Sequence, residues 1–447
     1  MKITKEIVER IEGEATLELE WENERITFSK MKFVNYRGIE EILKKRPLLD
    51  ALALTPRVCG ICSHSHAIAS VLALESCYQT AGEILHVSQK AHMIREIALN
   101  AEKIHNHIKW YFFTIVPELK RGLDVSYSGN AFKDKTWFHI QKAIVEILKM
   151  GAIFTGQWPH GSFVMPGGVT CDPLKSDVIL ARNILDNVIS ICEEHLYGVS
   201  LDEFLTYDSA LQVMSEPSAL HFGIETMQSL GFDQAGRSFD RFLALGDSFL
   251  YEGSLRAIKT TVLSADVRYV SESLAHTFFE DAKTGYTYSK SAQYKKSYFE
   301  VGPLARLMVG KEALIRDFHR RFKDAALTRV VARVVECAYL LSRTRDLLLS
   351  LPLSEPSFIP PKKDVHTLTS HGIGIVEAPR GTLIHDVSVK QGNIVSYNII
   401  TPTVWNLGNG EPENLSVTQK ALFGLDSLTK ADFVVKSFDV CSVCTTQ

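Results

Sequence analysis

The chain of 447 residues lacks the features that mark several specialised classes of protein. No apolar run reaches the roughly 20 residues that a membrane-spanning helix needs. Basic residues are not gathered in blocks, because 49 Lys and Arg are interspersed with 52 Asp and Glu for a formal charge of −3. Binding to a nucleic-acid backbone or to anionic lipid requires a denser basic patch. We therefore expect a globular protein that neither binds nucleic acid nor crosses a membrane.

A secretory leader is also missing from the first residues. The segment MKITKEIVERIEGEATLELE alternates charged with isolated apolar residues, whereas a leader has a basic stretch followed by an apolar one. This pattern favours a cytoplasmic location. Internal repeats and low-complexity segments are absent as well, which favours a single folded unit over an array of modules.

Cysteine is too scarce for a disulfide framework, since eight residues are spread over the whole chain. Four of them form two Cys-x-x-Cys pairs near opposite ends, Cys59 with Cys62 and Cys441 with Cys444. The other four lie in mostly apolar or helical surroundings, and we expect them to be buried as small hydrophobic side chains. They are Cys77, Cys171, Cys192 and Cys337.

The regular structure that is present is mainly helical. Apolar residues recur at three- and four-residue spacing in four long stretches, which predicts four long helices and a bundle-like core. These stretches run from about His86 to Ile115, Phe138 to Phe154, Lys175 to Leu205 and Lys311 to Leu351.

Strand patterns occur near both ends. Alternating apolar residues from Ala15 to Phe33 predict a hairpin, and short β-branched runs from Gly372 to Ile400 predict strands and turns. We therefore expect one mainly α domain over 1–447. Its parts are a β-hairpin with the first cysteine pair (1–85), a helical core (86–354), and a β-rich segment with the second pair (355–447).

A Cys-x-x-Cys pair can point two sulfurs at one metal ion. By spacing alone, a structural zinc site is the leading interpretation, followed by an iron–sulfur cluster and by redox or incidental thiols. Zinc modules, however, usually place their pairs 15 to 20 residues apart. Here nearly the whole chain separates the pairs, which favours a buried functional centre.

The neighbours of the cysteines carry a family resemblance. The stretch Arg57-Val-Cys59-Gly-Ile-Cys62-Ser-His-Ser-His66 resembles the Arg-x-Cys-Gly-x-Cys-x-x-x-His signature of the large subunit of nickel–iron hydrogenases. The stretch Asp439-Val-Cys441-Ser-Val-Cys444-Thr-Thr-Gln447 is similar to that family's closing Asp-Pro-Cys-x-x-Cys-x-x-His. Further family-like segments follow in family order: Arg10-Ile-Glu12-Gly13, Arg37-Gly-Ile-Glu40, Pro159-His160, Pro166-Gly-Gly-Val169, Glu300-Val-Gly-Pro-Leu-Ala-Arg306, Glu377-Ala-Pro-Arg380-Gly381 and Trp405-Asn-Leu407.

This resemblance implies a [NiFe]-hydrogenase-like fold and a nickel–iron centre that cleaves or forms dihydrogen heterolytically. Nickel would be held by all four cysteines, and Cys62 and Cys444 would also bridge to an iron that carries one carbon monoxide and two cyanides, Fe(CO)(CN)2. Soft thiolates suit such metals. Electrons would leave to an iron–sulfur small subunit, and from there to further electron-transfer subunits.

The resemblance also implies roles for residues around the centre. Arg380 matches an arginine that lies over the open metal position, and Asp439 matches the carboxylate that holds it. Glu12 matches a carboxylate on the proton path from Cys441. The terminal thiolate of Cys441 and Arg380 are rival candidates for the base that takes the proton. His66 matches a histidine that donates to a bridging thiolate.

A magnesium ion lies near the C-terminus in the family. The matching ligands here are the carboxylate of Glu40, the backbone carbonyl of Leu407 and residue 447. The last is Gln447 where the family has histidine, but an amide oxygen also suits a hard cation. A second departure is Val440, where the family has proline.

Two other functions are compatible with the same residues. The chain could be a hydrogen-sensing regulatory subunit that uses the centre for signalling, or a helical scaffold with a structural zinc held by four cysteines.

Overall fold

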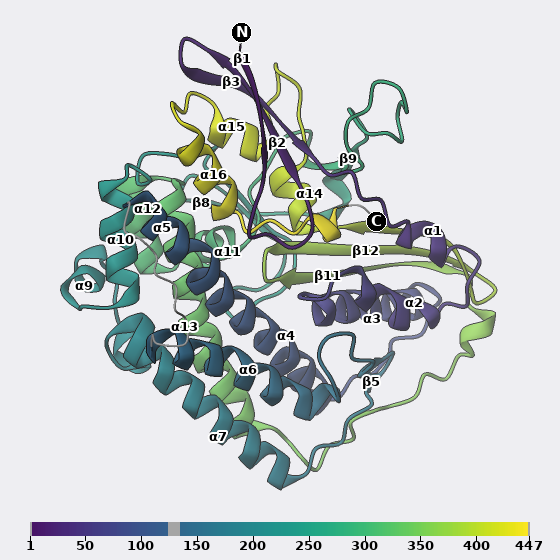
Figure 1. The fold of residues 1–447 in the computed structure, drawn as a ribbon. Helices are drawn as coiled ribbons and strands as arrows, with labels where there is room; N and C mark the ends of the chain where they lie inside the picture. The colour runs from purple at the N-terminus through teal and green to yellow at the C-terminus, as the bar shows by residue number, and fades with distance from the viewer. Residues whose placement is uncertain (1, 124–134, 446–447) are drawn as a thin grey trace.

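The computed structural model describes residues 2–123 and 135–445 (Figure 1). Helix is its predominant regular structure and far exceeds strand, which confirms the mainly α class. The α-helices are α1 Ile39–Leu43, α2 Asp50–Leu54, α3 Ser63–Thr80, α4 Gln89–Trp110, α5 Val116–Gly122, α6 Lys135–Thr155, α7 Lys175–Cys192, α8 Leu201–Phe204, α9 Ala210–Ser215, α10 Ala219–Ser229, α11 Pro303–Val309, α12 Ala313–Phe322, α13 Ala326–Ser350, α14 Pro402–Leu407, α15 Val417–Leu422 and α16 Leu428–Ser437.

The strands form small antiparallel sheets, in the orders β1-β2-β3, β4-β5, β6-β7-β8, β9-β10 and β11-β12-β13. Their bounds are β1 Lys2–Ile7, β2 Thr16–Glu22, β3 Arg25–Lys32, β4 Val164–Met165, β5 Gly168–Val169, β6 Arg241–Ala244, β7 Leu255–Ile258, β8 Thr261–Ser264, β9 Val270–Ser273, β10 Ser291–Tyr294, β11 Ser370–Ala378, β12 Gly381–Lys390 and β13 Asn393–Ile400.

The N-terminal hairpin and the C-terminal strands follow the sequence prediction. Strands β2 and β3 pair around Asn23 and Glu24, whose φ angles of 49° and 60° are those of a tight hairpin turn. Strand β1, which joins the same sheet, was not predicted. Most of its side chains are exposed, so its sequence carries no alternating apolar pattern.

Helices α4, α6, α7 and α13 form the helical body, with α4 packed between α6 and α13 (Figure 1). Two predicted helices are shorter than expected. The stretch from Lys311 is wrong as a single helix, because α12 and α13 are separated by Lys323 with a φ of 60°. Next to it, Asp324 accepts hydrogen bonds from Ser238, a tertiary contact that fixes the break. The stretch from Lys175 continues from α7 through the π-helix η3 (Glu193–Tyr197) and breaks at Gly198, whose φ is 78°, before α8.

Helix α3 lies directly against strands β11 and β12, so the first part of the chain packs against the last part. Glycine permits this close approach. A Cβ on Gly374 would lie 2.0 Å from the carbonyl oxygen of Ala69, and one on Gly372 would lie 2.1 Å from that of Ala73. The packing brings the start of α3 beside the turn between β11 and β12.

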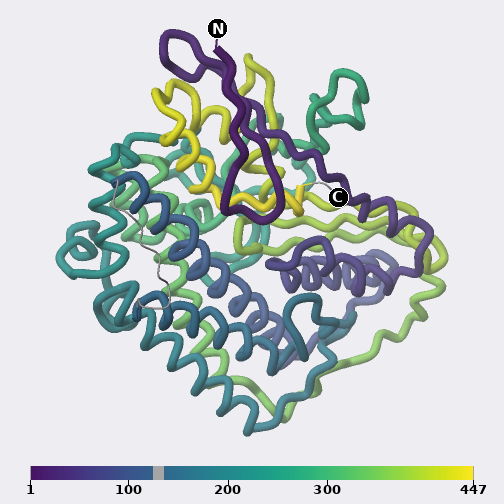
Figure 2. The backbone as a smooth tube through the Cα atoms, in the orientation of Figure 1, coloured from purple at the N-terminus to yellow at the C-terminus, as the bar shows by residue number. Residues whose placement is uncertain are grey.

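The loop between β1 and β2 meets the C-terminal segment in the middle of the molecule. Figure 2 shows the purple N-terminal loop lying beside the yellow C-terminal segment. The backbone of Glu12 forms a parallel bridge with Cys441, and the amide of Ser442 donates to the carbonyl of Glu12 at 2.8 Å. This bridge fixes the C-terminal segment against the N-terminal loop.

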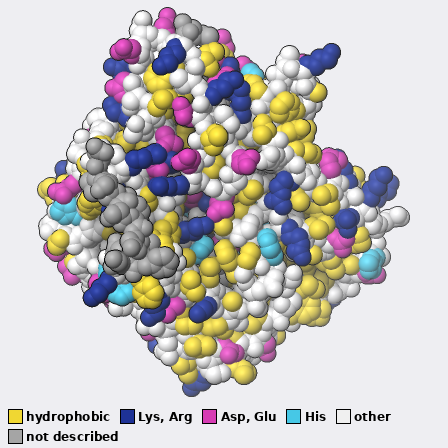
Figure 3. Space-filling model, viewed as in Figure 1, with side chains coloured by type: hydrophobic (Ala, Val, Ile, Leu, Met, Phe, Trp, Pro, Cys, Tyr) yellow, Lys and Arg dark blue, Asp and Glu magenta, His cyan; other side chains and the backbone are white. Residues whose placement is uncertain are grey.

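The face seen in Figure 3 mixes Lys and Arg with Asp and Glu, without a region of one sign. In the described ranges, no helix combines the length and the hydropathy needed to span a membrane.

Candidate metal centre

The four cysteines of the two Cys-x-x-Cys pairs form one buried cluster. The sulfurs of Cys441 and Cys444 are 2.9 Å apart, those of Cys62 and Cys444 are 3.4 Å apart, and those of Cys59 and Cys441 are 3.6 Å apart. All four sulfurs lie within 4.8 Å of one another, and each residue is at most 6% exposed. The structure thus brings together the ligands that the sequence placed at opposite ends.

The first pair is held where a 3₁₀ turn passes into a long helix. Cys59 follows η1 (Thr55–Val58), and Cys62 is the N-cap of α3. The buried carboxylate of Glu102 on α4 accepts hydrogen bonds from the amides of His64 and Ser65, at 2.7 and 3.0 Å. It therefore satisfies the free amides of the first helical turn directly after Cys62.

The second pair is held by backbone contacts. Besides the bridge between Glu12 and Cys441, the hydroxyl of Thr401 donates to the carbonyl of Cys444 at 2.8 Å. Cys444 ends the short 3₁₀ helix η6 (Ser442–Cys444), which curls the chain so that its sulfur turns back toward Cys441.

The sulfurs cannot all be charged without a compensating cation. Burial opposes ionisation of Cys59, but hydrogen bonds from the other thiols and the charge of Arg380 hold its pKa well below the ordinary value. Its neighbours respond in the opposite direction, because hydrogen bonding within the cluster raises the pKa of Cys62 and of Cys444 well above the ordinary value. Four soft, buried sulfur ligands, with too little positive charge nearby to balance four thiolates, are a suitable site for a thiophilic metal ion.

Arg380 provides the cationic group of the centre and is 6% exposed. Its Nε donates to the backbone carbonyl of Asp439 at 2.8 Å, and its Nη2 donates to the carboxylate of Asp439 at 3.0 Å. Nη1 is buried and has no hydrogen-bond partner among the described residues. Burial works against the charge, but the Asp439 carboxylate and the cysteine sulfurs keep the pKa of Arg380 well above its ordinary value.

A glycine turn presents Arg380 to the cluster. Gly381 has a φ of 133°, and a Cβ there would lie 2.5 Å from Val301. Gly302 has a φ of 119°, and a Cβ there would lie 2.8 Å from the carbonyl oxygen of Arg380. Two segments of the sequence, around 300–306 and 377–381, are thus packed together behind the guanidinium.

The backbone of Glu12 lies beside the cysteine cluster. Its side chain lines a pocket. The pocket has a volume of about 270 Å³ and is also lined by Arg380 and Asp439. Lys109 pairs with the Glu12 carboxylate at 2.9 Å, and both side chains are partly exposed. Glu12 therefore lies between the buried centre and solvent.

His66 is buried one helical turn after Cys62. Its Nδ1 is 3.0 Å from Nε2 of His385, whose Nδ1 is 2.8 Å from the hydroxyl of Tyr397. Burial lowers the pKa of His66 to about 4, although the nearby charge of Cys59 opposes the change. The neutral ring has only Nε2 left to face a thiolate.

Glu40 lies in a cluster of oxygen ligands. Its carboxylate accepts from the amide of Ile399 at 2.8 Å and from Lys290 at 3.2 Å, and Lys290 also contacts Asn398 and Glu272. Burial and the charge of Glu272 raise the pKa of Glu40, while Lys290 opposes the change. The carboxylates of Glu40 and Glu272 carry two negative charges, and the Lys290 ammonium balances only one of them. Leu407 ends α14 and is buried, and Gln447 lies outside the described residues.

A buried network that the sequence did not reveal continues from Asp439. Its carboxylate accepts from Arg333 on α13 at 3.0 Å, and Arg333 in turn contacts His107 on α4 at 3.3 Å. His107 is 2.8 Å from Glu336, which pairs with Arg306. The sequence indicates this network only through charged residues on the inward faces of otherwise apolar helices. Their pairing depends on how α4 and α13 cross.

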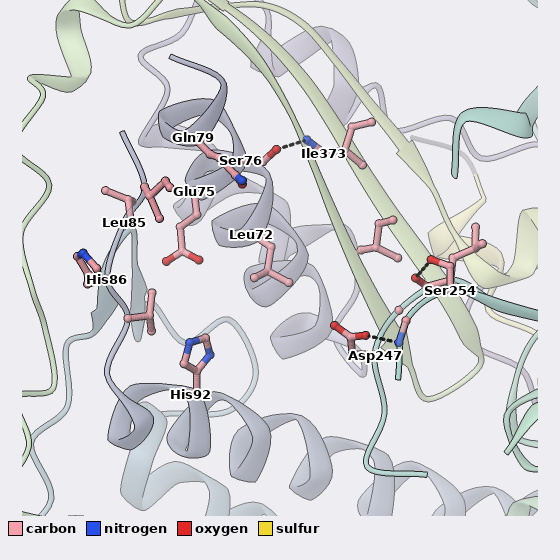
Figure 4. Close-up of a pocket in the computed structure, with 16 residues that line it drawn as sticks. Leu72, Glu75, Ser76, Gln79, Leu85, His86, His92, Asp247, Ser254 and Ile373 are labelled. Atoms are coloured by element: carbon pink, nitrogen blue, oxygen red, sulfur yellow. Dashed lines mark hydrogen bonds between the residues drawn. The ribbon is translucent and has the colours of Figure 1, made fainter. Parts of the chain in front are cut away.

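Two further features lie apart from the centre. A cleft of about 710 Å³ opens between α3, residues 84–92 and residues 245–254, and it is lined by none of the four cluster cysteines (Figure 4).

Of the other cysteines, Cys77, Cys192 and Cys337 are buried as expected. Cys171 is only half-buried, because it lies in the loop before α7.

Comparison with known proteins agrees with this geometry. The family model described as nickel-dependent hydrogenase matches residues 37–116 and 135–447. The beta subunit of the NAD-reducing hydrogenase HoxS of Cupriavidus necator is 25% identical, over 100% of this chain and 94% of its own. The large chain of hydrogenase-2 of Escherichia coli is 23% identical, over 99% of this chain and 96% of its own.

A solved structure shows the same fold. The Ni-Fe-Se hydrogenase from D. vulgaris Hildenborough in the reduced state matches with a TM-score of 0.83 and 22% identity, over 100% of both chains. The family match covers most of the chain and includes all four clustered cysteines. This chain therefore belongs to the nickel-dependent hydrogenase family, as a large, catalytic subunit and an oxidoreductase that acts on dihydrogen.

Proposed function

We propose that this chain holds a nickel–iron centre at Cys59, Cys62, Cys441 and Cys444 and transfers the proton of dihydrogen through its own side chains. The observation that carries the proposal is the buried cluster of four sulfurs beneath an arginine with one free nitrogen. A structural zinc site would not need a buried, unpartnered guanidinium nitrogen at its edge, because such a group is costly to leave unsatisfied.

Bound nickel and iron would supply the polarisation that makes dihydrogen acidic enough to lose a proton. The chain provides the groups around that reaction. Nη1 of Arg380 is a buried donor with no partner among the described residues, the charge of Arg380 acts on the Cys59 sulfur, and Asp439 fixes the guanidinium through two hydrogen bonds. Because its raised pKa keeps Arg380 protonated as a donor, the Cys441 thiolate is the group that would accept the proton, and the adjacent Glu12 is placed to carry it to the pocket.

The finer composition of the centre is also a proposal. We infer an Fe(CO)(CN)2 unit bridged by Cys62 and Cys444, and a Mg²⁺ ion held by Glu40, the carbonyl of Leu407 and Gln447. The oxygens of Glu40, Glu272 and Asn398, which gather around the Lys290 ammonium, are hard ligands of the kind that magnesium prefers. Electrons would pass to an iron–sulfur small subunit, because the four other cysteines of this chain form no further ligand cluster in the described part.

Infrared spectroscopy with metal analysis tests this assignment. In the purified complex we expect one nickel per large subunit, iron in excess of nickel because the small subunit's iron–sulfur clusters add to it, and absorption bands from carbon monoxide and cyanide bound to iron. A structural-zinc scaffold would show zinc without nickel and no such bands. A fast turnover with an artificial electron acceptor would favour an enzyme, whereas a hydrogen sensor with the same spectrum should be slow.

Glu12→Gln tests the proton path. The amide keeps the size of the side chain but cannot take up a proton, so we expect dihydrogen oxidation and isotope exchange between D2 and water to fall about 100-fold. The infrared bands should keep their intensity, because no metal ligand has changed.

The matched control is Glu9→Gln, an exposed carboxylate three residues earlier in the same loop. It should keep the normal rate. A Glu12→Gln enzyme that exchanges isotopes at the normal rate would remove Glu12 from the path.

A further inference from the structure

A second group of metal-ligand side chains lies where α6 and α7 meet, outside the thiolate centre. His139 lies near the start of α6, and Glu194 and His195 are consecutive in the π-helix η3 that follows α7. Their ligand atoms all lie within 4.8 Å of one another, and both histidines are partly buried. The antiparallel packing of α6 against α7 is what brings the three side chains together.

The distances fit a single metal ion. Nδ1 of His139 is 2.8 Å from Nε2 of His195, and this Nε2 is 3.6 Å from Oε1 of Glu194. Ligand atoms around tetrahedral zinc are about 3.3 Å apart, because the zinc–nitrogen distance is about 2.0 Å. The distances in this group, 2.8 and 3.6 Å, lie on either side of that value, and the sulfurs of the thiolate centre are 2.9 to 3.6 Å apart.

With neutral rings, one histidine donates to the other at 2.8 Å, and the Glu194 carboxylate has no cationic partner inside this group of three, whereas a protonated His195 would supply one. A divalent cation among the three atoms would accept a lone pair from each.

Glu194 and the preceding Glu193 have different partners. The preceding Glu193 is engaged, since it accepts a hydrogen bond from the amide of Leu201 at 2.7 Å. The turn that carries Glu194 and His195 is π-helical, a rare form that often occurs at functional sites. It ends at Gly198, whose φ of 78° stops the helix.

We propose that His139, Glu194 and His195 bind a divalent transition-metal ion such as Zn²⁺, with water completing the coordination. Two imidazoles and a carboxylate are a ligand set that zinc favours. The ion would tie the end of α7 to the start of α6. This site is independent of the hydrogenase reaction.

Calorimetric titration with ZnCl2 tests the proposal on the mature complex, which is first treated with a chelator and checked for full nickel content. We expect one zinc site per chain. His139→Gln, which keeps a polar side chain of similar size, should weaken zinc binding at least tenfold. Zinc should also raise the melting temperature of the unsubstituted complex but not of the variant, while nickel content and turnover stay the same in both.

The matched control is His371→Gln. His371 is an exposed histidine that pairs with Asp386 at 2.7 Å but is not one of the three clustered ligands. Its substitution should leave zinc affinity unchanged. Equal affinity in the His139→Gln complex, or no zinc uptake by the unsubstituted complex, would overturn the proposal.

Discussion

Replacing Cys62 by serine is expected to abolish assembly of the centre. The Cys62 sulfur lies 3.4 Å from that of Cys444, and the two are the proposed bridge between nickel and iron. A hydroxyl is a hard, weakly acidic ligand and bridges soft metals poorly. We expect the purified Cys62→Ser protein to lack stoichiometric nickel and iron, to show no carbonyl or cyanide bands, and to have no measurable dihydrogen oxidation.

Cys171→Ser is the matched control, because Cys171 is half-buried and outside the cluster. It should retain both metals and near-normal activity, which separates loss of a ligand from the general effect of removing a sulfur. A fully metallated, active Cys62→Ser protein would refute the ligand assignment.

Arg380→Lys is expected to keep the metals but to lose at least 99% of dihydrogen oxidation. Arg380 uses two nitrogens to hold Asp439 and leaves the third, Nη1, free at the cluster. A lysine has one nitrogen at the end of a flexible chain, so it cannot pair with Asp439 and also present a fixed donor. Loss of a single aligned donor typically costs about 100- to 1,000-fold in rate.

The measurement is turnover with an artificial acceptor, together with nickel content and the infrared spectrum of the same sample. Arg343→Lys is the control, because Arg343 also makes a two-nitrogen contact, to Glu96, but on the outside of the helical body. Arg343→Lys should be fully active. Near-normal turnover in Arg380→Lys would exclude Arg380 from the reaction.

The ligands and the long helices could be predicted because both depend on local signals. The spacing within each cysteine pair and the period of the apolar residues in α4, α6 and α13 are written in short stretches of sequence. The resemblance supplied Arg380 and Asp439, and the structure pairs them. What it could not supply was the partner of the Glu12 side chain, which is Lys109.

The remaining features depend on tertiary contacts. The break between α12 and α13 is fixed by Asp324 and Ser238, which are 86 residues apart in the chain. The contact of Arg333 with Asp439 joins residues 106 apart, and it exists only because α13 passes beside the C-terminal segment. Neither residue type nor spacing in one stretch of sequence can encode such a meeting.

The convergence of two distant cysteine pairs has a second consequence, which concerns the unfolded chain. A metal bound by both cysteine pairs closes a loop of 382 residues. A cross-link over a loop of that length lowers the entropy of the unfolded ensemble by an amount equivalent to about 6 kcal/mol at 25 °C. Since the second pair follows the first by so many residues, one metal can bind both pairs only after both have been synthesised. In the metal-loaded protein the two pairs should therefore stay linked through the metal on unfolding, whereas in the metal-free chain they are free to separate.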